Sequence, residues 1–145
     1  LVAFLMQTVQ IAVVLALGAL IFGYRPTGSL VALAAILLSF SAVLSALGVA
    51  LALWSRSRDA ALSLSNIIGM LAAGIGGSFS TVSSFPDWAQ HAARLSPAYW
   101  AITAIHEVSL DGAGLADVGT RIGVLWGLFA VIAGLALVQF RYHRE

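Results

Sequence analysis

The sequence contains no lysine and no cysteine, and these two absences remove several kinds of chemistry. All seven basic residues are arginines, so there is no lysine for a phosphate-binding loop, a Schiff base or a general base. Without cysteine there is no thiol nucleophile, no thiolate metal site and no disulfide. The GxSxG and HExxH patterns are also missing. The chain therefore cannot hydrolyse ATP by itself, and an enzyme built on it would depend on its three histidines.

Charge of either sign is scarce as well. Only 9% of the 145 residues are charged and 61% are hydrophobic, and the mean hydropathy is +1.00. Such a chain has too few polar groups to cover a soluble globule, which predicts a membrane protein with no separate soluble domain. The net charge of +1 gives no reason to expect nucleic acid as a partner.

Four apolar stretches are long enough to cross a bilayer. Each lacks Asp, Glu, Lys and Arg and holds close to the roughly 20 residues that a bilayer core requires. They are residues 1–22, 30–54, 60–79 and 122–140. The predicted fold class is therefore all-α, a polytopic membrane bundle with four transmembrane helices in a single domain over residues 1–145.

Two of the three prolines interrupt the apolar segment between the third and fourth stretches. Pro86 and Pro97 each suit the first turn of a short helix, where the missing N–H does no harm. The nearby aromatic residues with polar tips, which favour the headgroup layer, are Trp88, Tyr99 and Trp100. This pattern predicts a re-entrant helical hairpin in the outer leaflet. The alternative is a surface loop that only rests on the membrane as an anchor.

The arginines are distributed unevenly between the two predicted sides of the membrane. Arg56 and Arg58 share one side with Arg141 and Arg144, and three arginines lie on the other. The positive-inside rule predicts that the first side is cytoplasmic. There, Arg56 and Arg58 would contact either a partner subunit or the anionic headgroups of the inner leaflet.

Small residues recur every four positions along the third predicted span. This ridge consists of Ala61, Ser65, Gly69, Ala73 and Gly77, and Asn66 lies beside it. Small residues let two helix backbones approach closely, and an amide inside the membrane needs polar partners. The ridge is a candidate for helix packing within the chain, for a subunit interface or for the lining of a pathway. Similar spacing occurs at Ala42, Ala46 and Ala50 and at Gly119, Gly123 and Gly127.

The histidines offer an alternative, a metal site on the outer side. His91, His106 and Glu107, with Asp87 or Asp111, would supply its ligands. No two of them show the tight spacing of zinc ligands, so solvation at the interface is the favoured interpretation.

The order of these features resembles the membrane (permease) subunit of the type-2 ABC transporters, over its C-terminal portion. Members commonly have a glycine-rich span, a Pro-x-Trp step, a Leu-x-Pro step followed by an aromatic residue, and a final span. The matching positions here are residues 69–77, Pro86 with Trp88, Leu95 with Pro97, Tyr99 with Trp100, and residues 122–140. His106 departs from the pattern, because an arginine is often found there. The resemblance implies that residues 1–145 belong to a longer permease with six spans.

The resemblance also implies a mechanism. A separate ABC ATPase subunit would drive export of a drug, lipid, peptide or glycan, and a second permease copy, identical or related, would complete the pathway. The predicted hairpin would help close the outer mouth. The location would be the inner (plasma) membrane, multi-pass, in contact with membrane lipids and without a cofactor. The alternatives are a non-transporting assembly or anchoring subunit, and a polytopic membrane enzyme that uses the histidines.

Overall fold

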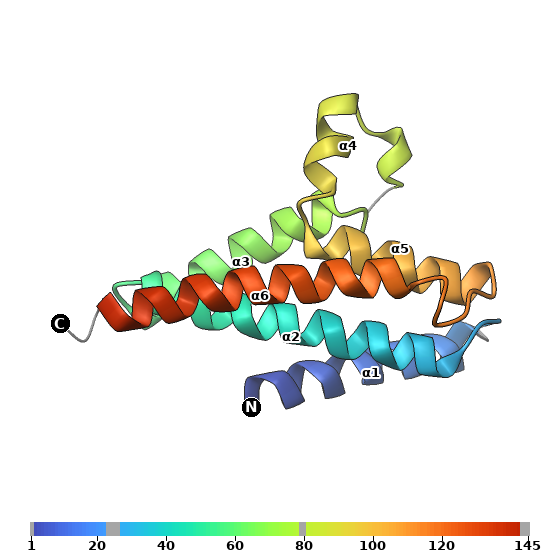
Figure 1. Cartoon of the computed structure of the whole chain (residues 1–145), viewed down its shortest axis with the longest axis horizontal. Coiled ribbons are helices and arrows are strands. Elements are labelled where there is room, and N and C mark those ends of the chain that lie inside the picture. The colour runs from blue at the N-terminus through green and yellow to red at the C-terminus, as the bar shows by residue number, and fades with distance from the viewer. Residues whose placement is uncertain (1, 23–26, 79–80, 143–145) are drawn as a thin grey trace.

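The chain is folded entirely into helices where its structure is described. The structure is a computed structural model that describes residues 2–22, 27–78 and 81–142, and over these residues it contains no β-strand (Figure 1). Its elements are α1 (Val2–Phe22), α2 (Leu30–Trp54), α3 (Arg58–Ile75), the 3-10 turn η1 (Val82–Ser84), α4 (Asp87–Ala93), α5 (Pro97–Leu110) and α6 (Gly119–Tyr142). The all-α prediction is confirmed.

Side-chain caps explain where several of these helices begin. Ser29 precedes α2 and accepts a hydrogen bond from the Ala32 N–H at 3.3 Å, and Ser57 accepts one from the Ala60 N–H at 3.2 Å before α3. Each serine satisfies one of the amide groups that a first helical turn leaves without an internal partner. These caps set the starts of α2 and α3 from local sequence alone.

The third predicted span ends earlier than expected. It was predicted to continue through residue 79, but α3 stops at Ile75 because two glycines follow. Gly77 adopts a left-handed φ of 96°, the Ser78 N–H donates to the Ala73 carbonyl at 3.0 Å, and the Gly77 N–H donates to Gly74. This is a Schellman motif, which satisfies the last carbonyls of the helix and turns the chain away. Residue 79 itself lies outside the described residues.

Two helices of the described chain have the length and composition of membrane spans. They are α2 and the part of α6 from Gly119 to Arg141. The apolar stretch found in α1 is shorter, Phe4–Gly18, and α3 contains Arg58 and Asp59 in its first turn. The structure therefore shows helices at all four predicted stretches and the character of a span in two of them.

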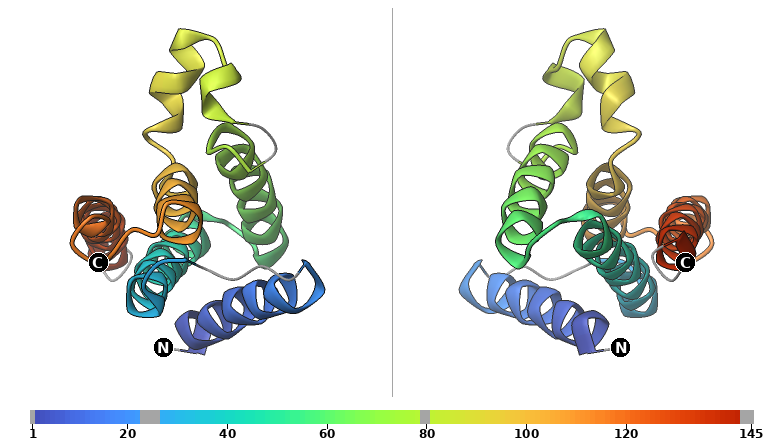
Figure 2. Two further views of the ribbon diagram at one scale, coloured as in Figure 1. Left: turned by 90° about the vertical axis from the view of Figure 1, so that its right-hand side faces the viewer. Right: turned by 90° about the vertical axis from the view of Figure 1, so that its left-hand side faces the viewer.

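Helix α2 lies at the centre of the bundle. It contacts α1, α3, α5 and α6, and α1 and α6 lie on different sides of it (Figure 2). One group of fully buried residues joins α2, α5 and the turn just before α6. It consists of Ala32, Ile36, Ala104, Val108 and Val118. A second group, Val43, Ala101 and Leu125, continues the same contact along the bundle. The small residues of α5 let it lie close to α2 and α6.

Gly28, just before α2, is held tightly against the end of α5. The Thr27 hydroxyl donates to the Ser109 carbonyl at 3.1 Å, and a Cβ at Gly28 would lie 2.3 Å from the Val108 carbonyl oxygen and 2.6 Å from that of Ala113. These neighbours are backbone atoms, so an added methyl group forces the two segments apart. The close approach of the loop to α5 therefore requires glycine at this position.

We predict that Gly28→Ala lowers the free energy of unfolding by about 1–3 kcal/mol, the usual cost of overpacking. Gly48→Ala is the matched control, because Gly48 lies inside α2 with no atom within 4 Å of an added Cβ. Alanine there should be neutral or stabilising by up to about 1 kcal/mol through helix propensity. The melting temperatures of both variants are compared by heating them in detergent and measuring the remaining folded protein by size-exclusion chromatography. Equal melting temperatures would show that the loop adjusts freely.

Candidate functional site at the helical tip and α5

Residues 81–96, here called the tip, project away from the helix bundle (Figures 1 and 2). The tip contains η1 and the seven-residue helix α4, which Pro86 precedes. The Gln90 side chain donates to the Phe85 carbonyl at 2.8 Å and holds the entry turn. Helix α5 begins with Pro97 in its first turn, after Ser96 in an extended conformation. The prediction of two helices, each opened by a proline, is confirmed.

The tip exposes large apolar side chains. Trp88 is 75% exposed and Leu95 is 79% exposed. The polar residues Asp87, His91 and Arg94 are exposed too. The described part of this chain therefore leaves both faces of the tip uncovered, and any partner of Trp88 must come from outside it.

Ser96 fixes the junction between the tip and the bundle. Its hydroxyl donates to the Ala72 carbonyl of α3 at 2.8 Å and accepts from the Ala98 N–H at 3.3 Å. Gly76, directly after α3, also lies close to the start of α5, because a Cβ added at Gly76 would lie 2.8 Å from the Ala98 Cβ. The start of α5 is thus held against the end of α3, and the position of the tip follows from that contact.

Aromatic residues strengthen the same junction. The Trp100 indole N–H donates to the Arg94 carbonyl at 2.7 Å, so the last residue of the predicted hairpin reaches back to the end of α4. Tyr99 and Trp100 contact each other edge to face, with ring centroids 5.3 Å apart. Both are partly buried, unlike Trp88. Of the three aromatic residues predicted for the hairpin, Tyr99 and Trp100 are therefore anchored by contacts within the chain, and Trp88 is exposed.

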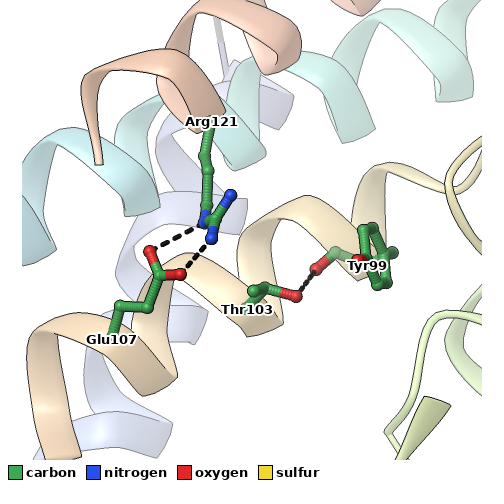
Figure 3. A network of polar contacts seen from close by, with 4 residues as sticks. All are labelled: Tyr99, Thr103, Glu107 and Arg121. Atoms are coloured by element: carbon green, nitrogen blue, oxygen red, sulfur yellow. Dashed lines mark hydrogen bonds and ion pairs between the residues drawn. The ribbon is translucent and has the colours of Figure 1, made fainter. Parts of the chain in front are cut away.

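A line of polar side chains runs along α5 on the side away from its buried alanines. Tyr99, Thr103 and Glu107 follow one another every four residues, and the Thr103 hydroxyl donates to the Tyr99 carbonyl at 2.7 Å (Figure 3). At its end, Arg121 of α6 donates from Nε to Glu107 Oε2 at 2.7 Å and from Nη2 to Glu107 Oε1. This two-point ion pair joins α5 to α6, and its side chains are 27% (Arg121) and 26% (Glu107) exposed.

The small-residue ridge of α3 is only partly covered by the chain itself. Ser65 and Ala73 are partly buried, whereas Asn66 and Gly69 are exposed, and no atom lies within 4 Å of an added Cβ at Gly69. Gly77 lies past the helix end, in the left-handed turn. By contrast, the corresponding residues of α2, Ala42, Ala46 and Ala50, are buried. The chain itself therefore covers the α2 residues and leaves the middle of the α3 ridge open.

Comparison with known protein families identifies the chain. The family model described as ABC-2 family transporter protein matches residues 1–138, nearly the whole sequence. The chain belongs to the ABC-2 transporter family. It is thus a transmembrane, permease-type component of an ABC transport system. No curated protein and no solved structure gives a significant match.

The Glu107–Arg121 ion pair of this ABC-2 protein was missed by sequence reasoning. From the sequence, Glu107 is named only as a possible metal ligand and Arg121 has no assigned partner. No spacing rule connects them, because 14 positions and a loop separate two residues on different helices. A usable signal existed: Glu107 is the only Asp, Glu, Lys or Arg in α5, and a charge in an apolar helix commonly has a partner.

The metal-site alternative receives no support from the geometry. Glu107 is engaged by Arg121, and His91 Nδ1 lies 2.7 Å from the backbone carbonyl of Asp87, one turn earlier in α4. Among the described residues, no group of three or more His, Asp or Glu side chains gathers where it could hold a metal ion. Arg56 and Arg58, the predicted partner or lipid contacts, are exposed at the turn between α2 and α3.

Proposed function

We propose that this chain forms part of the translocation pathway of an exporter that a separate ATPase subunit drives. The family match over residues 1–138 is the observation that carries this proposal. Residues 1–145 contain no lysine for a phosphate-binding loop, so the ATPase must lie outside them. A second permease copy, identical or related, would enclose the other side of the pathway.

The proposed topology has four transmembrane helices, α1, α2, α3 and α6, in the inner (plasma) membrane. Helices α2 and α6 run in the same direction through the bundle (Figure 1). Their C-terminal ends carry Arg56, just after α2, and Arg141, whereas Asp111 and Asp117 follow α5 near the N-terminal end of α6. The arginine-rich end suits the cytoplasm. The tip and the first turn of α5 would then form the re-entrant hairpin of the outer leaflet.

We predict that a cysteine at Ser57 is labelled only from the cytoplasm and one at Ser84 only from outside. The printed sequence has no cysteine of its own, so each single variant reports one position. Intact cells are treated with a membrane-impermeant maleimide, and permeabilised cells serve as the control in which both positions react. Labelling at position 57 but not at 84 in intact cells would reverse the proposed orientation.

The tip is proposed to help close the outer mouth of the pathway. The contacts of Ser96 and Trp100 fix its base on α3 and α5, while Trp88 is free to meet a second copy or the membrane surface. The open middle of the α3 ridge, with Asn66 and Gly69, is the proposed lining of the pathway or the face toward the second copy. Arg56 and Arg58 are proposed to contact the ATPase subunit or anionic headgroups.

The function is tested by purifying the full-length protein in a mild detergent and identifying the proteins bound to it. We expect a subunit with a phosphate-binding loop to co-purify, and its ATPase activity to respond to amphipathic compounds in proteoliposomes. Binding without any such response would favour the anchoring subunit instead. If no ATPase is bound, the proposal fails.

We predict that Trp88→Ala lowers export several-fold while leaving the protein in the membrane and bound to its ATPase. Trp88 is exposed in the isolated chain, so its removal should cost little folding free energy. At the proposed contact with a second copy it would be a buried aromatic anchor, and the loss of such an anchor commonly costs more than about 1 kcal/mol of binding free energy. Leu110→Ala is the control, since Leu110 is an exposed apolar residue outside the tip. Wild-type export by the Trp88 variant would leave the tip only an anchoring role.

A further inference from the structure

A large apolar cavity lies between α1, α2 and α6. Its volume is about 740 Å³, within the range of sites that hold small molecules. Its lining comes from all three helices and includes Phe4 of α1, Ser45 and Leu53 of α2, and Ala133 and Phe140 of α6. It is separate from the tip, the α3 ridge and the polar line of α5.

The arrangement of the helices keeps this cavity open. Helix α1 packs on α2 and has at most marginal contact with the other described helices. It therefore lies beside α2 without closing on α6 (Figure 2). Ser45 is the only polar residue among the described residues of the lining, and an apolar cavity of this kind does not favour water. Its contents should be hydrocarbon.

Positive charge stands at one end of the cavity. The lining ends at Leu53 on α2 and at Phe140 on α6, and these helices run in the same direction (Figure 1). Arg141 follows Phe140 directly, and Arg56 follows Leu53 by three residues. Both arginines are exposed, at the same end of the bundle. Arg56 and Arg141 thus form a basic rim at one end of the apolar cavity.

We propose that this cavity is a binding site for an anionic phospholipid, with acyl chains between α1 and α6 and the phosphate at Arg56 and Arg141. Basic pockets between membrane helices are suited to anionic headgroups, and guanidinium groups bind phosphate oxygens with two parallel hydrogen bonds. The two arginines at the rim favour an anionic lipid over a second copy of the protein, because a second copy would need only the apolar face and not the positive charge. This site goes beyond the proposed transport role, because it holds a resident lipid rather than the cargo.

Native mass spectrometry of the full-length protein tests the headgroup. The probes are phosphatidylglycerol and phosphatidylcholine with the same acyl chains, added in equal amounts. We expect the wild type to retain phosphatidylglycerol at least several-fold better, and the double variant Arg56→Gln, Arg141→Gln to lose that preference. Arg94→Gln on the tip is the control and should keep it. Equal retention of the two lipids by the wild type would overturn the proposal.

A second variant tests the cavity itself. Ala133→Phe places a ring in the lining and should reduce retention of both lipids, whereas Val131→Phe, on an exposed position of the same helix, should not. If Ala133→Phe instead changes the oligomeric state and leaves the bound lipid unaltered, the cavity is covered by protein and the proposal is wrong. Neither result depends on finding the ATPase, so this site can fail while the transport proposal stands.

Discussion

Arg121→Leu is expected to reduce the amount of folded protein in the membrane and to loosen α5 from α6. The substitution leaves the Glu107 carboxylate without its two-point partner at a place where three quarters of the side chain is covered. Breaking a pair costs about 3–5 kcal/mol when it is fully buried, whereas an exposed pair contributes at most about 1 kcal/mol. Because this pair is partly exposed, we expect the free energy of unfolding to fall by an amount between these two limits.

A charge exchange separates the ion pair from simple packing. Glu107→Arg combined with Arg121→Glu should recover much of the stability that each single substitution removes, because the attraction between the helices is restored. Arg94→Leu is the control for loss of a positive charge, since Arg94 is exposed on the tip and forms no ion pair with an acidic side chain among the described residues. The measurement is the melting temperature in detergent, together with the yield from membranes. If Arg121→Leu has the same melting temperature as the wild type, the ion pair has no structural role.

Ala104→Leu is expected to displace α5 and to lower both stability and export. Ala104 is fully buried in the group formed with Ile36 and Val118, where no space is left for three further carbon atoms. Overpacking of such a core usually costs about 1–3 kcal/mol. Since α5 carries the base of the tip, the displacement should also disturb the proposed closure of the outer mouth.

The matched control for this variant lies two residues further along the same helix. His106 is exposed, so His106→Leu adds an apolar side chain to α5 without entering the bundle. It should leave the melting temperature close to that of the wild type. Export is compared in cells at equal expression. If both variants behave alike, the alanine face of α5 is not the contact that positions the tip.

The starts of the helices could be predicted from the sequence because the signals are local. Pro86 and Pro97 each disrupt a preceding helix and suit a first turn, and α4 and α5 begin at or directly after them. The end of α3 was misplaced even though its signal was local. Apolar content extends past Ile75, but the glycine pair that follows turns the chain.

The small-residue ridges show the limit of periodicity. The same four-residue spacing occurs in α2, where Ala46 is buried, and in α3, where no atom of the described residues lies within 4 Å of a Cβ added at Gly69. Spacing places residues on one face of a helix, but the neighbour of that face depends on how the helices are arranged.

By itself, the sequence determined the all-α class, the positions of the helices and the absence of a lysine-based phosphate site, because composition, caps and prolines act over a few residues. Only the tertiary structure decided that Glu107 pairs with Arg121, that α5 lies buried against α2, and that a cavity opens between α1 and α6. Each of these features depends on the relative placement of helices that are far apart in the chain, and that placement is set by packing in three dimensions.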